Sequence, residues 1–228
     1  EEWRTPWWPT GNVACYEGRV VTLADCATHE PAIVEVSGGA SRVLRSSSQE
    51  HLSEDLISVA QAVSWTSSDG ETVHGFYYAP KNPEFTAPEG SLPPLLVNVH
   101  GGPTSSARPG LSIAVQYWTS RGFAFLDVNY RGSTGYGRKY RQRLNGHWGV
   151  LDVQDCAEGA QYLVSQGLAD PERIAIRGRS SGGYTVLSAL ADSDVFTAGT
   201  SLFGIGDLKL LEATTHKFES HYDKFLIG

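Results

Sequence analysis

Short apolar runs alternate with helix-like segments from Leu95 to the end of this 228-residue chain. Apolar runs without polar alternation are typical of strands that are buried on both faces of a parallel sheet, because helices then cover both sides. The pattern predicts an α/β fold with a mostly parallel, doubly wound sheet. The expected strands are 95–99, 123–128, 173–177 and 198–203, and the expected helices are 111–121, 150–166 and 184–191.

The first 61 residues follow a different pattern. Short strands at 13–16, 19–24, 31–36 and 41–45 are separated by turn residues, which indicates antiparallel hairpins. Four strands with one apolar face need a neighbour to cover that face, as in one blade of a β-propeller. We therefore expect residues 1–61 to be the C-terminal part of a propeller domain and residues 62–228 to be the N-terminal part of an α/β domain.

The α/β part is expected to open with a hairpin. Strands at 63–67 and 72–79 can pair through the turn Ser68-Asp69-Gly70. A stretch rich in Pro, Gly and Glu follows at 80–94, and we expect it to be a surface loop.

Composition excludes several classes of partner. The net charge of −7 argues against a nucleic-acid partner or an anionic membrane surface, both of which require a basic footprint. Three cysteines without a CxxC pair argue against a disulfide framework and a zinc site, so a reducing, cytoplasmic setting is expected. Runs of about 18 apolar residues are absent from the sequence, and no spanning helix is expected. We expect no metal or other cofactor, and homo-oligomerisation stays open.

A strand-to-helix turn carries the most specific motif. Gly178-Arg179-Ser180-Ser181-Gly182-Gly183 follows the expected strand 173–177 and opens a helix, which is the setting of the G-x-S-x-G nucleophile elbow. The turn is so tight that the serine is strained and its neighbours have little room for side chains. Ser180 fits the frame, whereas a shift to Ser181 would put Arg179 at a glycine position. Ser180 is therefore the predicted nucleophile of an α/β-hydrolase.

A second glycine motif follows the expected strand 95–99. His100-Gly101-Gly102-Pro103 contains consecutive glycines, which let backbone N–H groups approach a negatively charged oxygen. We expect the N–H of Gly101 or Gly102 to form an oxyanion hole together with the N–H of Ser181. Taken alone, the motif is equally compatible with a plain tight turn. The elbow some eighty residues further on favours the oxyanion hole.

The order of these motifs resembles that of a known peptidase family. Between the two glycine motifs stand Asn129-Tyr130-Arg131-Gly132-Ser133-Thr134-Gly135-Tyr136-Gly137 and then Trp148-Gly149 with Asp152 and Asp155. The series resembles the catalytic domain of the prolyl oligopeptidase family from about Ala62 onward, in particular its acylaminoacyl-peptidase and dipeptidyl-peptidase-like members. The resemblance implies an α/β-hydrolase capped by an N-terminal propeller, acting as a serine peptidase on short peptides through an acyl-enzyme on Ser180.

Other residues of these motifs are candidates for substrate binding. Arg131 follows a strand end on the catalytic edge, where a guanidinium can bind a substrate carboxylate, although a structural salt bridge is the alternative. Tyr130 and His100 are candidates for the pocket wall. Some family members have a tyrosine at the position of His100 and use its hydroxyl in the oxyanion hole, so backbone amides are expected to do this here. Asp152 and Asp155 stand three residues apart at a helix start, where they complement the helix dipole better than they would bind a metal.

The rest of a catalytic triad is hard to find. In this fold the acid and then the histidine follow the serine on later strand ends, and only forty-eight residues follow Ser180. The candidates after Ser180 stand too early in the chain; they are Asp207, His216, His221 and Asp223. We therefore expect the Asp and His to lie beyond residue 228 and the fragment alone to be inactive. The alternatives are a carboxylesterase on the same fold and a non-catalytic interaction protein that kept the fold.

Overall fold

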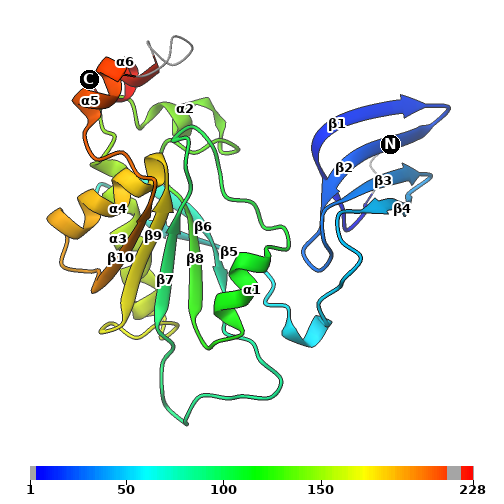
Figure 1. The fold of residues 1–228 in the computed structure, drawn as a ribbon, viewed down its shortest axis with the longest axis horizontal. Coiled ribbons are helices and arrows are strands. Elements are labelled where there is room, and N and C mark those ends of the chain that lie inside the picture. Colours follow the sequence, from blue (N-terminus) through cyan, green and yellow to red (C-terminus); the bar gives the residue numbers. More distant parts are fainter. Residues whose placement is uncertain (1–3, 215–221, 228) are drawn as a thin grey trace.

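The N-terminal sheet has four antiparallel strands in the order β1-β2-β3-β4 (Figure 1). The structure is a computed structural model that describes residues 4–214 and 222–227. Glu17-Gly18 and Gly38-Gly39 have positive φ angles, so each closes a tight hairpin as the turn pattern predicts. The strands are β1 (Trp8–Tyr16), β2 (Arg19–Asp25), β3 (Ala32–Ser37) and β4 (Ala40–Ser46).

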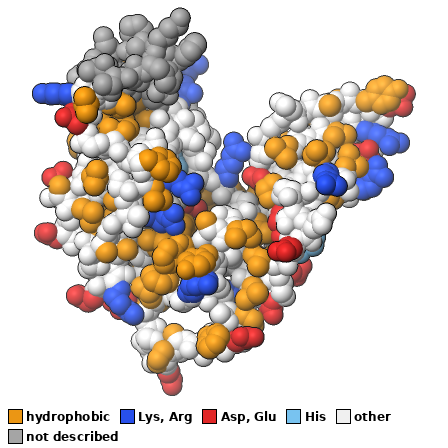
Figure 2. Space-filling view, in the orientation of Figure 1, with side chains coloured by type: hydrophobic (Ala, Val, Ile, Leu, Met, Phe, Trp, Pro, Cys, Tyr) orange, Lys and Arg blue, Asp and Glu red, His pale blue; other side chains and the backbone are white. Residues whose placement is uncertain are grey.

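One face of this sheet has a small core of its own, formed by Trp7, Ala24, Cys26, Ala32, Val34 and Val36. The opposite face leaves Leu23 46% and Ile33 43% exposed, and apolar side chains stand out on the surface in Figure 2. β1 begins five residues earlier than the sequence pattern predicts. A register shift between Pro9 and Val13 lets the strand continue through Pro9 and Gly11, which would otherwise interrupt it.

The second sheet has six strands in the order β10-β9-β7-β8-β6-β5. β6 pairs with β5 and with β8 in antiparallel fashion, and the remaining pairs are parallel. The predicted mostly parallel α/β sheet is thereby confirmed. The strands are β5 (Gln61–Thr66), β6 (Thr72–Tyr78), β7 (Leu95–Val99), β8 (Ala124–Asn129), β9 (Ile174–Arg179) and β10 (Ala198–Leu202).

Helices cover both faces of this sheet (Figure 1). Val97 and Leu126 belong to the main core on the side of α3 and α4, whereas Leu96 and Phe125 pack with Val115 of α1 on the other side. The helix α4 begins at Ser181 and not at Tyr184, directly after the strand, because Gly182 and Gly183 occupy its first turn. The helices are α1 (Ile113–Thr119), α2 (Gly137–Gln142), α3 (Leu151–Ser165), α4 (Ser181–Asp192), α5 (Leu208–Thr214) and α6 (Tyr222–Ile227), with a short 3-10 helix at Glu54–Leu56.

The two sheets touch through the loop that follows β7. The N–H of Leu111 donates to the carbonyl oxygen of Cys26 at 2.8 Å, and a Cβ on Gly110 would lie 3.1 Å from the Cβ of Asp25. Lys81 joins the linker to the α/β part by donating to the carbonyls of Glu54 and Ile57. A notch separates the rest of the small sheet from the α/β part (Figure 2). Among the helices of the described ranges, none has the length and apolar character needed to cross a bilayer.

Candidate active site

Ser180 stands at the turn between β9 and α4, at the carboxyl edge of the parallel strands. Its backbone has φ +52° and ψ −121°, a conformation that residues with a side chain rarely adopt. The N–H of Ser180 donates to the carbonyl oxygen of Leu202 at 3.1 Å, which ties the turn to β10. The side chain is exposed. The predicted strand, strained turn and helix are therefore all present at this motif.

The glycines around Ser180 are required by close packing. A Cβ on Gly178 would lie 2.3 Å from the carbonyl oxygen of Gly182, and a Cβ on Gly182 would lie 2.4 Å from that of Val99. A Cβ on Gly183 would lie 2.6 Å from the Cα of Gly204. Any side chain at these positions would push α4 away from β7, β9 or the end of β10. The absence of side chains thus allows the helix to begin directly behind Ser180.

The loop after β7 lies against the same turn. A Cβ on Gly101 would lie 3.6 Å from the Cβ of Ser180 and 3.1 Å from the carbonyl oxygen of Arg179. Gly102 has φ +134°, a value that glycine adopts readily. Ser181 is 2% exposed in the first turn of α4, and its hydroxyl has no partner among the described residues. The structure therefore brings together Ser180, Ser181 and the Gly101-Gly102 loop.

The side chain of His100 holds this loop in place. Its Nδ1 lies 2.9 Å from the carbonyl oxygen of Gly101, and its Nε2 lies 2.7 Å from the Oγ of Ser133. A carbonyl oxygen only accepts, so Nδ1 carries the proton and Nε2 accepts from Ser133. Burial lowers the pKa of His100 to about 4, which keeps the ring neutral. His100 thereby holds the Gly101–Gly102 peptide, whose N–H points opposite to the bound carbonyl.

Tyr130 lies beneath the same loop. Its ring stacks on His100 with 4.4 Å between ring centroids, and only 1% of the residue is exposed. The hydroxyl lies 3.1 Å from the carbonyl oxygen of Pro103 and 3.3 Å from that of His100, so its single proton has two acceptors within reach. Burial leaves Tyr130 almost no surface for a substrate, and its contacts are those of a support for the loop.

Arg131 is enclosed in a salt bridge. The guanidinium is 1% exposed, and its Nε and Nη2 donate to Asp155 at 2.9 Å and 2.6 Å. Nη1 pairs with Asp69, and Nη2 also reaches the Oγ of Ser67. Of the two roles left open by the sequence, this geometry favours the structural salt bridge over a substrate carboxylate, because the carboxylate positions around the guanidinium are already filled.

Asp155 and Asp152 each have a protein partner. Burial raises the pKa of Asp155 to about 6, although Arg131 opposes the shift. Asp152 accepts from the N–H of Gly149 at 2.6 Å and from the hydroxyl of Thr185 at 2.5 Å. The second bond joins α3 to α4, the helix that carries Ser181. No sequence signal pointed to Thr185, because its partner stands 33 residues away on another helix.

The remaining triad candidates divide into two groups. Asp207 accepts from the N–H groups of Lys209 and Leu210 at 2.8 Å and 3.1 Å, so its carboxylate caps α5. His216 and His221 lie outside the described residues, and Asp223 belongs to α6 in a part whose side chains are not described. Within residues 4–214 and 222–227, no hydrogen bond reaches the hydroxyl of Ser180.

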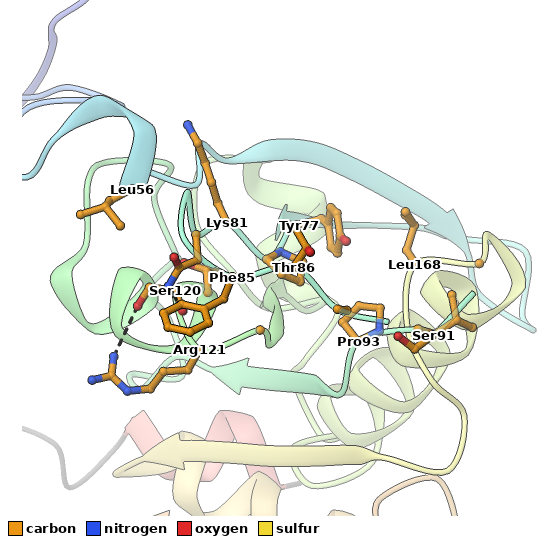
Figure 3. A pocket seen from close by; sticks show the side chains of 17 residues that line it. Leu56, Tyr77, Lys81, Phe85, Thr86, Ser91, Pro93, Ser120, Arg121 and Leu168 are labelled. Carbon is orange, nitrogen blue, oxygen red and sulfur yellow. Dashed lines mark hydrogen bonds between the residues drawn. The ribbon is translucent and has the colours of Figure 1, made fainter. Parts of the chain in front are cut away.

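A cavity of about 1240 Å³ lies at the opposite edge of the sheet (Figure 3). It is bordered by the loop between β6 and β7 and includes Leu56, Tyr77, Phe85 and Leu168 in its lining. β7 begins at this edge and runs towards His100, so the cavity and Ser180 are separated by the length of the strands.

This fold is that of an α/β-hydrolase with a serine at its nucleophile elbow position. The family model for the prolyl oligopeptidase family matches residues 109–228, which is more than half of the chain. The chain belongs to the prolyl oligopeptidase family.

Solved structures agree with this assignment. A puromycin-hydrolyzing peptidase of Mycobacterium tuberculosis is 44% identical with a TM-score of 0.92, over 95% of this chain and 34% of that chain. An acylaminoacyl peptidase of Pyrococcus horikoshii is 29% identical with a TM-score of 0.79, over 99% and 35% of the two chains. The chain thus spans about a third of each.

A curated relative matches over a shorter stretch. Dipeptidyl aminopeptidase BIII of Pseudoxanthomonas mexicana is 37% identical over 122 residues, which cover 53% of this chain and 18% of the relative. All three relatives are named as peptidases.

Proposed function

We propose that the protein containing this chain is a serine peptidase that hydrolyses peptide bonds of short peptides, with Ser180 as its nucleophile. The observation that carries the proposal is the strained backbone of Ser180, with φ +52°, at a helix start packed against the Gly101-Gly102 loop. Backbone strain of this kind is characteristic of functional turns. The exposed Ser180 side chain is accessible to a substrate carbonyl.

The proposed reaction has two half-reactions. The Oγ of Ser180 attacks the scissile carbonyl carbon while a histidine takes its proton, and the negatively charged oxygen accepts hydrogen bonds from the N–H of Gly101 or Gly102 and from that of Ser181. Collapse of the intermediate breaks the C–N bond, and the amine leaves with the proton from the histidine. Water then attacks the acyl-enzyme, and its proton passes through the histidine to Ser180, releasing the acid product.

The histidine and the aspartate that orients it are proposed to lie outside these 228 residues. Two observations support this: Asp207 already caps α5, and both ring nitrogens of His100 already have partners. A chain without the base and the acid is expected to lose several orders of magnitude in rate, because these groups act as a unit with the serine.

The remaining proposals concern domains, substrates and location. Residues 1–61 are proposed to be the C-terminal part of a β-propeller, since their sheet leaves apolar side chains such as Leu23, Ile33 and Val43 exposed, and residues 62–228 the N-terminal part of the catalytic domain. A mutant of a related puromycin hydrolase, with serine replaced by alanine, was solved with PGG, which supports short peptides as substrates. A cytoplasmic location is proposed from the free cysteines Cys15, Cys26 and Cys156.

Labelling with a fluorophosphonate probe tests the nucleophile. The intact protein is expected to be labelled and the Ser180→Ala variant to stay unlabelled. Ser181→Ala is the matched control, because it removes the neighbouring hydroxyl and keeps the backbone N–H; this variant is expected to keep its label. Labelling of Ser180→Ala at the rate of the unmodified protein would exclude Ser180 as the nucleophile.

A further inference from the structure

Asn129 is the last residue of β8, and its buried side chain binds the backbone of Ala107, which stands 22 residues earlier in the chain. Only 1% of Asn129 is exposed. Its Oδ1 accepts the N–H of Ala107 at 2.8 Å, and its Nδ2 donates to the carbonyl oxygen of Ala107 at 3.2 Å. The amide thus pairs with both backbone groups of one residue, as the backbone of a neighbouring strand would. Because the N–H only donates and the carbonyl only accepts, the two bonds fix the orientation of the amide.

Two tyrosines hold Asn129 in turn. Its Nδ2 also donates to the hydroxyl of Tyr136 at 3.0 Å, and the hydroxyl of Tyr140 on α2 donates to the carbonyl oxygen of Asn129 at 2.6 Å. The ring of Tyr136 stacks on His74 of β6, with 4.4 Å between the ring centroids. The amide oxygen and the amide nitrogen of Asn129 therefore both have partners, and a buried amide with all of these bonds is held rigidly.

Ala107 belongs to a connecting segment, residues 103–112, which joins the Gly101-Gly102 loop to α1 (Figure 1). Near its end, Leu111 is hydrogen-bonded to the chain directly after β2 of the small sheet. Ala107 stands between this contact and the Gly101-Gly102 loop. Asn129 therefore fixes the part of the segment that leads back to the loop beside Ser180.

This part of the connecting segment packs closely against Gly102. A Cβ on Gly102 would lie 2.8 Å from the backbone nitrogen of Thr104 and 3.1 Å from that of Ser105. The carbonyl oxygen of Ser105 accepts the N–H of Thr134 at 2.8 Å, which adds a second anchor next to Ala107. Because packing this close leaves no free space, a displacement of the segment would also move Gly102 and turn its N–H group.

We propose that Asn129 is a positioning residue, which holds Ala107 and thereby keeps the N–H groups of the Gly101-Gly102 loop directed at the reacting carbonyl oxygen. The inference rests on the proposed function, in which these N–H groups stabilise the negatively charged oxygen. An oxyanion hole is effective because its donors are fixed in place before the reaction begins. A small misplacement of such a group, caused by a change away from the reacting atoms, lowers the rate strongly.

Asn129→Ala tests this role in the intact protein, with the best cleaved of a panel of aminoacyl and dipeptidyl 7-amino-4-methylcoumarins as substrate. The variant is expected to lower kcat about tenfold and to change KM less than about twofold, because stabilisation is lost mainly in the transition state. Affinity for a peptide aldehyde, which forms a tetrahedral adduct with Ser180, should also fall about tenfold. Tyr136→Phe removes one bond to Nδ2 and keeps the aromatic ring, so the same changes of about two- to threefold are expected.

Gln116→Ala is the matched control. Gln116 on α1 is 5% exposed and binds both backbone groups of Ser58 in the same way, with its Oε1 2.7 Å from the nitrogen and its Nε2 3.0 Å from the carbonyl oxygen. Its loss should lower the urea midpoint about as much as the loss of Asn129. Because Ser58 belongs to the linker and not to the connecting segment, kcat and aldehyde affinity should stay within about twofold of their normal values.

Fluorophosphonate labelling of the unmodified protein separates failure of this inference from failure of the proposed function. If Ser180 is not labelled, the proposed function fails first. If Ser180 is labelled but Asn129→Ala keeps its kcat, loses kcat without losing aldehyde affinity, or loses no more of either than Gln116→Ala, the positioning role is overturned and the nucleophile assignment stands. If Asn129→Ala does not fold, Tyr136→Phe decides: a parallel fall in kcat and aldehyde affinity supports the role, and any other result overturns it.

Discussion

The Nδ1–H of His100 donates to the carbonyl oxygen of Gly101 at 2.9 Å, and the same ring accepts from Ser133 through Nε2 at 2.7 Å. These two bonds select one tautomer and hold the peptide that joins Gly101 to Gly102. The proposed oxyanion donors are thus oriented by a side chain from the same motif. Burial keeps the ring neutral, so Nε2 remains free to accept.

His100→Ala is expected to lower kcat by about ten- to hundredfold with little change in KM. Misdirected N–H groups lose much of their stabilisation of the transition state, whereas binding of the substrate changes little. Affinity for a peptide aldehyde, which forms a tetrahedral adduct, should fall in parallel with kcat in the intact protein. His147→Ala is the control, because His147 is exposed and its ring bonds a local carbonyl, that of Asn145. A rise in KM with unchanged kcat would contradict this positioning role.

Gly182→Ala is expected to destabilise the protein by about 2–3 kcal/mol, since the added methyl would lie 2.4 Å from the carbonyl oxygen of Val99 and neither backbone can yield easily. Urea unfolding followed by tryptophan fluorescence measures the loss. Gly11→Ala is the matched control, because its methyl would meet only Leu23, at 3.7 Å. Equal urea midpoints for the two variants would show that a methyl group fits at Gly182, and would contradict the close packing of this turn.

Arg131→Met is expected to cost about 3–5 kcal/mol of stability, because it leaves the carboxylate of Asp155 buried without its partner. The double variant Arg131→Met/Asp155→Leu should recover most of the loss, and KM of the folded protein should not change. Arg173→Ala removes a more exposed ion pair, with Asp170, and should cost under about 1 kcal/mol. A large rise in KM for Arg131→Met at normal stability would restore a substrate role for Arg131.

Asp127→Asn tests the pH dependence of stability. Burial raises the pKa of Asp127 to about 6, above its ordinary value of 3.8, although the bond from Asn98 opposes this. The folded protein therefore holds this proton more tightly, and the stability it contributes is present below about pH 4 and is lost as pH rises through about 6. As the pH rises from 4 to 7, the free energy of unfolding of the variant should therefore increase by about 2 kcal/mol relative to that of the unmodified protein.

Urea unfolding at a series of pH values measures this gain. Asp170→Asn should show the opposite sign, because backbone and Arg173 hydrogen bonds lower the pKa of Asp170. A difference between Asp127→Asn and the unmodified protein that does not vary with pH would contradict the raised pKa of Asp127.

Most of the fold could be predicted from local sequence patterns. Apolar runs such as 95–99 and 123–128 became strands of the parallel sheet, because residues buried on both faces need mostly apolar side chains along their length. The frame of glycines around Ser180 could be found from sequence for a similar reason: each glycine is required by a contact within the turn itself or with the strand ends beside it. The early start of β1 was missed because a bulge, which depends on pairing with β2, carries Pro9 through the strand.

The sequence by itself determined the alternation of strands and helices, the elbow at Ser180 and the glycines beside it, because these depend on side-chain size and polarity within short segments. Only the tertiary structure decided that Arg131 is enclosed by Asp155 and Asp69, and that Asp152 joins α3 to α4. Each of these depends on partners brought together by the order of strands in the sheet, and that order is set by packing of the whole chain.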